Sequence, residues 1–383
     1  MGLVGKILWG LFLLLSIVSS ASAVCVGSTQ NYSCGETITE SCTLNSNLNT
    51  TGTCFTIGVD DVLLNGAGYQ ITGDDGGVDM YIYGVNVTGQ NNVSIVYLNV
   101  VNFSWGIYLE TVRDSNVTGN NITQNYRGIV FMDVNDTVVQ ENNILSNTWD
   151  GLNIWATSVS NIIRNNNIQD NAGDGGIVFS DQGFDPDPTD NQITDNNVMG
   201  NNDGIIFWAY CWGSNLCDTG GDNNIVTNNN ISNNSGTAIN MSCTENFPGY
   251  CDSFAISLNL NNNNNITNNT IEENLRGIVL DYATSSDIYE NTICNNTLID
   301  IDNSTSDPTA EGVNNSCNNT SGWNDAGATG CTNACGGITT STTTTSSSST
   351  TTTIGGGATT TICPPNTLCL LDGWNLISYW LTP

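Results

Sequence analysis

Residues 125–147 read "NYRGIVFMDVNDTVVQENNILSN", a segment that begins and ends on an asparagine in matching surroundings. The residues "NNITQ" stand at the first asparagine's N-terminal side, and "NNILS" stand before the second. Asparagine disfavours the interior of helices and strands, but it tolerates the left-handed backbone conformation of tight corners. We therefore expect the chain to turn at the same point of every repeat.

The same pattern recurs along most of the chain. Each copy is marked by an apolar residue; a β-branched residue stands five positions earlier, an asparagine two earlier and another asparagine three later. The apolar residues that mark the copies are Ile122, Ile144, Ile168, Val198, Ile231, Ile271 and Ile293. After most of them a small residue opens a short apolar segment, as in "GIVF" at Gly128.

This period predicts a solenoid. Segments of three or four residues with alternating apolar and polar character are typical of short strands. A repeat of roughly 22 residues holds three such strands with their turns, which is one coil of a parallel β-helix. Coils stack at about 4.8 Å, so the Ile and Val columns fill the core and stacked asparagines can hydrogen-bond between coils. The sequence thus predicts an all-β fold of roughly ten coils with a Cys-rich N-terminal cap.

Composition divides the chain into five parts. Residues 1–23 read as a secretory signal peptide, with a basic start, an apolar run and a small-residue cleavage site. Residues 24–60 hold the cap and the first coils, and residues 61–335 hold the parallel β-helix. A Ser/Thr-rich linker follows at 336–362, and residues 363–383 begin a C-terminal β segment that we expect to be truncated. Because the N-terminal apolar run is too short to span a membrane, we expect an extracellular or cell-surface protein without a transmembrane helix.

Charge and cysteine content agree with secretion. The chain has 36 acidic and 5 basic residues and a formal net charge of −31, a surface that repels nucleic acid and attracts cations. Fourteen cysteines predict disulfides, and Asn-X-Ser/Thr sequons such as Asn86 permit a glycoprotein. Several cysteines lie close in pairs, although the sequence leaves their connectivity open: Cys25/Cys34, Cys42/Cys54, Cys211/Cys217, Cys243/Cys251, Cys331/Cys335 and Cys363/Cys369.

The segment "LLNGAGYQITG" at 63–73, the "NNITQN" corners and the "RGIVF" strands resemble the right-handed parallel β-helix, or pectin-lyase-like, proteins. Within these, the chain looks like the NosD-like repeats, the carbohydrate-binding and sugar-hydrolase (CASH) group of prokaryotic surface proteins. The resemblance covers about residues 35–310 and implies a right-handed, single-stranded coil path. The scaffold hosts lyases, hydrolases, adhesins and inert stalks, so the resemblance is weak for function. The NosD name suggests copper, but a chain without His offers copper few ligands.

Three aspartates are candidate catalytic residues. Asp150, Asp174 and Asp203 stand before the small residue of successive coils, flanked by Arg127. Carboxylates stacked this closely repel, so one should keep its proton to higher pH, which is the pairing that inverting glycoside hydrolysis requires. However, "NTWDG" at 147–151 only loosely resembles the "NTDG" of polygalacturonases, a family that also needs a histidine and a basic motif. A lyase would need Arg127 as base beside calcium, and its repeat position favours a turn role instead.

Aromatic residues near these aspartates are candidates for glycan binding. They are Trp149, Trp155, Trp208, Tyr210 and Trp212. Trp155 and Trp208 hold equivalent places two coils apart, about 10 Å by strand spacing, which suits two sugar units stacking along the axis. Long insertions at 180–190, 208–222 and 242–263 follow the same strand on three successive coils, so we expect them to form one wall.

Calcium is the one cofactor that the sequence raises. Acidic side chains in the first insertion supply hard oxygen ligands, although their spacing matches no EF-hand and a solvated acidic loop is the alternative. These residues are Asp181, Asp185, Asp187 and Asp190.

Three functions remain open at this point. A surface module that binds a polysaccharide or cell-surface glycan through an aromatic and acidic face explains the signal, stalk, insertions and tryptophans. A glycoside hydrolase or lyase is the second hypothesis, and a passive stalk or surface-layer component that contacts other surface proteins is the third.

Overall fold

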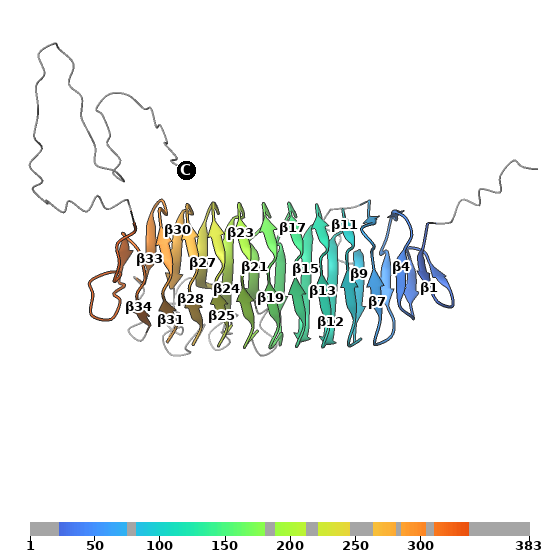
Figure 1. Ribbon diagram of the computed structural model, residues 1–383, viewed down its shortest axis with the longest axis horizontal. Helices are drawn as coiled ribbons and strands as arrows, with labels where there is room; N and C mark the ends of the chain where they lie inside the picture. Colours follow the sequence, from blue (N-terminus) through green and yellow to red (C-terminus); the bar gives the residue numbers. More distant parts are fainter. Residues whose placement is uncertain are drawn as a thin grey trace, which may run out of the picture. The chain divides into compact units, whose positions relative to one another are not determined.

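The computed structural model describes residues 23–74, 82–180, 188–211, 221–245, 263–280, 285–303 and 310–336. All of them lie in the first of two compact units, Met1–Gly336; none lies in the second, Gly337–Pro383. The described residues form strands that stack side by side in three sheets (Figure 1). None of the residues described forms a helix that could cross a membrane.

Sheet A has 13 strands. In spatial order they are β2 (Asn31–Tyr32), β1 (Cys25–Gly27), β4 (Cys42–Leu44), β7 (Leu63–Asn65), β10 (Ser94–Val96), β13 (Asn116–Thr118), β16 (Val138–Gln140), β19 (Ile162–Arg164), β22 (Gln192–Thr194), β25 (Ile225–Thr227), β28 (Asn265–Thr267), β31 (Asp287–Tyr289) and β34 (Glu311–Val313).

Sheet B has 12 strands and contains the longest ones. They are β3 (Glu36–Ile38), β6 (Phe55–Ile57), β9 (Tyr83–Thr88), β12 (Trp105–Arg113), β15 (Arg127–Asn135), β18 (Leu152–Trp155), β21 (Gly175–Ser180), β24 (Asp203–Cys211), β27 (Thr237–Glu245), β30 (Arg276–Leu280), β33 (Ile299–Asp302) and β35 (Thr320–Ser321).

Sheet C has 10 strands, in agreement with the roughly ten coils that the sequence predicts. They are β5 (Leu48–Asn49), β8 (Gln70–Thr72), β11 (Asn99–Val101), β14 (Asn121–Thr123), β17 (Asn143–Leu145), β20 (Asn167–Gln169), β23 (Asn197–Met199), β26 (Asn230–Ser232), β29 (Thr270–Glu272) and β32 (Thr292–Cys294). Each coil runs through sheets A, C and B in turn and then passes to the next.

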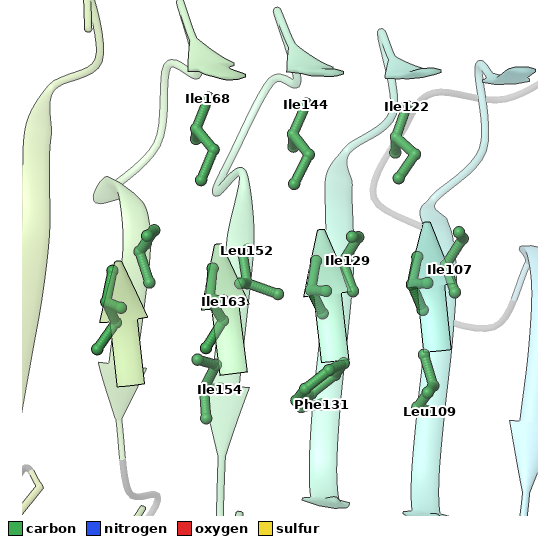
Figure 2. Packing of buried hydrophobic residues seen from close by; sticks show 14 of the residues in the cluster. Ile107, Leu109, Ile122, Ile129, Phe131, Ile144, Leu152, Ile154, Ile163 and Ile168 are labelled. Atoms are coloured by element: carbon green, nitrogen blue, oxygen red, sulfur yellow. The ribbon is translucent and has the colours of Figure 1, made fainter. Parts of the chain in front are cut away.

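The expected columns form the core. Ile122, Ile144 and Ile168 are register partners on β14, β17 and β20, and each is fully buried (Figure 2). The small residue near the start of the sheet B strands is required for a steric reason. A Cβ on Gly128, for example, would lie 2.3 Å from the carbonyl oxygen of Gly151. Such a contact has no room for a methyl group, so this column stays small.

Buried asparagines connect the coils through directional ladders. Asn142 Oδ1 accepts the backbone N–H and the side-chain Nδ2 of Asn120, and Asn142 Nδ2 donates to Asn166 Oδ1 and to the Val117 carbonyl. The Asn125 column repeats this geometry, and a third ladder runs through Asn161, Asn191, Asn224 and Asn264. The buried amides of the ladders thereby find partners, which makes the polar corners compatible with a dry interior.

The backbone at these corners corrects one expectation. The left-handed conformation falls on the residue before each ladder asparagine, as at Gln124, Glu141 and Ser146, whose φ angles lie between 53° and 57°. Asparagine is therefore selected in the ladders for its paired donor and acceptor, and the strained position is open to several residue types.

The two ends of the solenoid are pinned by disulfides. Cys25 is bonded to Cys42 and Cys34 to Cys54, so the close pairs suggested by the sequence are wrong at this end. The reason is that β1 runs antiparallel to β4, which places Gly27 opposite Cys42 and folds the cap back on itself.

The C-terminal end carries Cys294–Cys335 and Cys317–Cys331, so the suggested Cys331/Cys335 pair is also wrong. The suggested partners Cys217 and Cys251 and the pair Cys363/Cys369 lie outside the described residues. These disulfides are typical of an oxidising compartment outside the cytoplasm.

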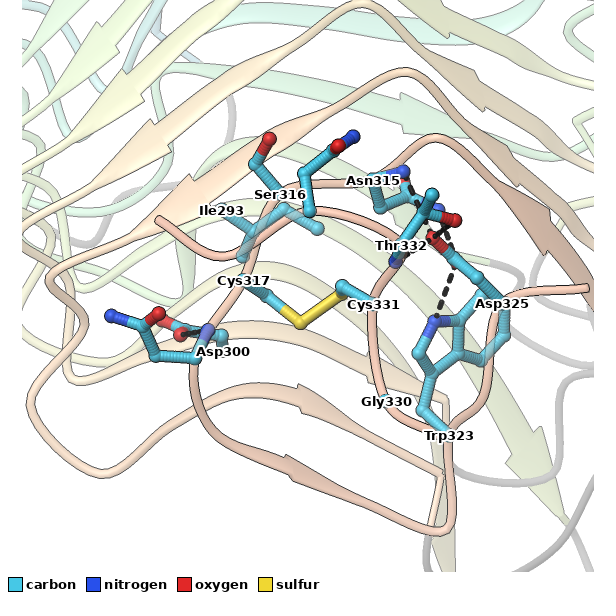
Figure 3. Close-up of a disulfide and its surroundings, with 12 residues drawn as sticks. Ile293, Asp300, Asn315, Ser316, Cys317, Trp323, Asp325, Gly330, Cys331 and Thr332 are labelled. Carbon is cyan, nitrogen blue, oxygen red and sulfur yellow. Dashed lines mark hydrogen bonds between the residues drawn. A yellow bond between two sulfur atoms is a disulfide. The ribbon is translucent and has the colours of Figure 1, made fainter. Parts of the chain in front are cut away.

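Two of the ladders end on carboxylates at this C-terminal end. Asp325 accepts the backbone N–H and Nδ2 of Asn315 and the indole N–H of Trp323 (Figure 3). Asp300 accepts Nδ2 of Asn296, the last amide of the Asn125 ladder. Each ladder donates toward the C-terminus, so an acceptor that needs no donor of its own closes it.

Candidate functional site

The candidate site lies on the outer face of sheet B. The parallel register of the strands aligns the outward-pointing side chains of successive coils in columns. One column contains Tyr83, Trp105 and Arg127 on β9, β12 and β15. A second contains Met132, Trp155, Ser180 and Trp208, so Trp155 and Trp208 do hold equivalent places two coils apart.

Four aromatic rings pack together on this face, and we call them the aromatic cluster: Tyr83, Trp105, Tyr108 and Trp155. The rings of Tyr83 and Tyr108 stack at a centroid distance of 5.1 Å. Trp105 lies 4.8 Å from Tyr108 and 5.8 Å, edge-on, from Trp155. Trp105 and Trp155 are 7% and 6% exposed, so little of either ring reaches the surface. Stacking of a sugar on Trp155 requires a free ring face, and the packing of Trp155 against Trp105 leaves little of its ring exposed. This stacking stays a prediction.

Arg127 is enclosed by this cluster. Its guanidinium carbon lies 4.7 Å from the ring centre of Trp155, 5.6 Å from Tyr126 and 6.0 Å from Trp105. Its Nε lies 3.7 Å from Asp150 Oδ2, and the arginine side chain is 14% exposed. The positive charge is thus held by aromatic faces and by one buried carboxylate.

Asp150 is fully buried, and both of its oxygens are occupied. Oδ2 accepts Asn153 Nδ2 at 2.6 Å, and Oδ1 accepts the backbone N–H groups of Asp174 and Gly175 at 3.0 and 3.3 Å. Burial, followed by the nearby Asp174 carboxylate, raises the pKa of Asp150 to about 6, although Arg127 opposes this shift.

Asp203 repeats this arrangement two coils later. It accepts the backbone N–H of Thr237 at 2.5 Å and Asn240 Nδ2 at 2.9 Å, and burial raises its pKa. Each of the two aspartates thus accepts hydrogen bonds from the backbone of the next coil and from one asparagine side chain. For Asp150 this asparagine is Asn153 on the same coil, and for Asp203 it is Asn240 on the next coil. Asp174 is half-buried and lies one residue before the column position of Asp203, since Gly175 is the register partner. Burial raises the pKa of Asp174 as well.

Several polar atoms of this region are buried and make no hydrogen bond within the protein. They include Ser104 Oγ, Trp105 Nε1, Arg127 Nε and Asn153 Oδ1. Asn153 is 3% exposed, and its other amide atom is held by Asp150. Native interiors satisfy nearly all such groups, so a cluster of unsatisfied ones at one place indicates a functional surface.

The remaining predicted residues are spread more widely. Trp149 is half-buried against Tyr126, with ring centres 5.6 Å apart, and Trp208 is half-buried on β24. The Tyr210 side chain, Trp212, and most of each insertion lie outside the described residues. So do Asp181, Asp185 and Asp187, whereas Asp190 occupies a left-handed corner with φ of 57°. Among the described residues no group of three or more metal-ligating side chains comes together, so calcium gains no support.

Sequence reasoning missed four residues of this region: Tyr83, Tyr108, Ser104 and Asn153. A signal was present for Tyr83, which stands 22 residues before Trp105 and 44 before Arg127, and therefore shares their column. The sequence carries no such signal for Asn153, because its contact with Asp150 depends on how the side chains on the outer face of sheet B pack.

Residues 62–216 match the family model described as "Right handed beta helix region". The fold is a right-handed parallel β-helix. Among solved β-helix structures, the A-module of mannuronan C-5 epimerase AlgE4 from Azotobacter vinelandii matches with 16% identity and a TM-score of 0.51, over 78% of this chain and 82% of that one.

Two further β-helix structures are similar. The A-module of the Azotobacter vinelandii epimerase AlgE6 has 16% identity and a TM-score of 0.48, over 76% of this chain and 81% of that one. DFA-IIIase from Arthrobacter chlorophenolicus A6, without its lid and in complex with GF2, has 11% identity and a TM-score of 0.49, over 74% and 70% of the two chains. At these identities the likeness concerns the fold alone. No curated protein matches the chain.

Proposed function

We propose that this β-helix is a secreted or cell-surface protein that binds a glycan on the outer face of sheet B, at the aromatic cluster and the polar groups beside Arg127. One observation carries the proposal: buried polar atoms without hydrogen-bond partners coincide with a cluster of packed aromatic rings on the outer face of sheet B. Sugars offer both C–H faces for aromatic contact and hydroxyl groups that donate and accept. Trp105 Nε1 could donate to a sugar hydroxyl, and Asn153 Oδ1 could accept from one, once the side chains that bury these two atoms move aside.

The geometry of the aspartates favours binding over hydrolysis. A general acid must reach the proton acceptor of the substrate within hydrogen-bond distance. Asp150 is as buried as the polar atoms proposed for binding, but its oxygens already accept three hydrogen bonds, whereas Trp105 Nε1 and Asn153 Oδ1 accept or donate none. Asp203 is used in the same way, which supports a structural clamp at both places.

The fold adds general support. The β-helix with the 0.51 TM-score is named as an epimerase of mannuronan, which is consistent with a glycan ligand for this chain. Disulfides at both ends suit a protein that works outside the cytoplasm. A passive stalk would not need unsatisfied donors and acceptors at one place.

The test is glycan binding by the full secreted chain, measured by calorimetry after a screen of polysaccharides. Trp105→Phe keeps most of the ring packing but removes the free N–H donor, and we expect it to weaken binding roughly tenfold. Tyr97→Ala is the matched control, because Tyr97 is 57% exposed and follows β10 of sheet A. Equal affinities for wild type and Trp105→Phe would contradict the proposed site. New reducing ends released from any substrate would contradict a role in binding alone.

A further inference from the structure

The charges around the aromatic cluster define which glycans this face can accept. Arg127 is the cation inside the cluster, and it is enclosed by three aromatic rings and paired with Asp150. Arg113 lies at the far end of β12, and Arg164 lies on sheet A, where it donates to Gln140. Arg276 is exposed at the start of β30, two coils beyond Asp203 in the same column, where its charge opposes the rise that burial causes in the pKa of Asp203.

Acidic groups face the same region from several strands. Glu110 lies on β12, two residues from Tyr108, and burial, followed by the charge of Glu110, raises the pKa of Tyr108. Asp174 precedes β21, and Asp203 begins β24. Beside the aromatic cluster, Arg127 is the one cation among the described residues and is already paired with Asp150, so an incoming carboxylate there would meet acidic groups, on a chain whose formal net charge is −31. Opening the Arg127–Asp150 pair would not help, because it would leave Asp150 as an unpaired buried charge.

Apart from Arg127 Nε, which faces Asp150, the atoms without a hydrogen bond are on uncharged groups. Asn153 Oδ1 is an amide acceptor, Ser104 Oγ is a hydroxyl that can donate or accept, and Trp105 Nε1 is an indole donor. These partners match sugar hydroxyl groups, and none of them can form the bidentate ion pair with which proteins recognise a carboxylate.

We infer that the ligand is an uncharged glycan and that polyuronates are excluded from this face. The inference rests on the proposed function and adds the substrate class to it. The β-helix AlgE4 is named for mannuronan, a polyuronate, so this chain would use a similar scaffold with the opposite charge preference. Selectivity arises from repulsion of the wrong ligand as well as from contacts with the right one.

The experiment compares oligosaccharides of equal length on the full secreted chain: neutral gluco- and manno-oligosaccharides, oligomannuronate, oligogalacturonate and the cationic oligomers of chitosan. We expect at least one neutral series to bind at least tenfold more tightly than either polyuronate, with an affinity that is unchanged between low and high ionic strength. Preferred binding of a polyuronate would overturn the inference. So would preferred binding of chitosan oligomers that disappears at high ionic strength, because that pattern reflects net charge alone.

A pair of variants tests the origin of the preference. Asp174→Asn removes a charge beside the cluster and should narrow the ratio of neutral to polyuronate affinity several-fold at neutral pH. Asp136→Asn is the control, since Asp136 is an exposed left-handed corner residue between β15 and β16, which asparagine suits equally well. An equal ratio in both variants would contradict the charge argument. Absence of binding by every oligosaccharide would instead contradict the proposed function, and the two failures are therefore distinguishable.

Discussion

Replacement of Asp150 by asparagine should shift the difference in stability toward the variant as the pH rises from 4 to 7. Burial gives Asp150 a pKa of about 6, against an ordinary value of 3.8, even after the favourable effect of Arg127. In the Asp150→Asn variant the new amide would keep an acceptor for the backbone N–H groups of Asp174 and Gly175. Its Nδ2 would face Asn153, whose amide can turn over to present the Oδ1 that now has no partner.

The sign and size follow from proton linkage. The folded protein binds the Asp150 proton more tightly than the unfolded chain, so stability is present at low pH and is lost as pH rises from 3.8 through about 6. The full shift corresponds to about 3 kcal/mol of unfolding free energy, of which roughly 2 kcal/mol falls between pH 4 and pH 7. Asp150→Asn cannot lose this contribution, because it has no proton to release.

The assay is urea denaturation of wild type and Asp150→Asn at several pH values between 4 and 7, followed by circular dichroism. The difference in unfolding free energy should grow in favour of the variant by roughly 2 kcal/mol across this range, which removes the pH dependence common to both chains. Asp136→Asn, a substitution at an exposed corner, is the control for the effect of the Asp-to-Asn exchange itself. A constant difference between pH 4 and pH 7 would refute the assignment of Asp150 as a buried, partly protonated acid.

Three further predictions concern the solenoid. Asn166→Ala should lower the unfolding free energy by at least about 3 kcal/mol in urea denaturation, because it leaves the buried partners of four hydrogen bonds unmatched. The control Asn143→Ala, at an exposed position, should change it by no more than about 0.5 kcal/mol. Gly128→Ala should lower the thermal midpoint sharply, whereas Gly52→Ala, with no atom within 4 Å of a new Cβ, should not; equal midpoints would contradict the packing of the small column. Peptide mapping without reduction should recover Cys25 linked to Cys42 and Cys34 linked to Cys54, and fragments that join Cys25 to Cys34 would contradict the cap.

The repeat could be predicted because the same residue types recur at the same positions of each copy. Alternation about Ile122 and Ile144 dictates one buried side chain per short strand, and the flanking asparagines mark the corners. The third ladder is harder to see, because Ser115 and Thr137 take its first places before Asn161 begins the asparagine run. Only side-chain hydrogen bonding unites these three residue types.

The disulfides and the site depend on distances that no repeat encodes. The pairing of Cys25 with Cys42 follows from the reversal of β1 against β4, and that reversal occurs once, at the end of the chain. Arg127 and Asp150 could be placed near each other from their repeat positions. Their burial could not, since it arises from the aromatic rings of three neighbouring coils that pack over one guanidinium.

The one-way ladders have a consequence for how such a protein can change its length. Within the interior every coil accepts from the coil before it and donates to the coil after it, so a duplicated coil would find the same partners on both sides. Asp300 and Asp325 end their two series as terminal acceptors, and a coil added beyond them would meet carboxylates where it needs amides. Tandem duplication of a coil is therefore compatible with the ladders in the middle of the solenoid but not beyond Asp300 and Asp325. The length of such a solenoid can change during evolution while its C-terminal coil stays the same.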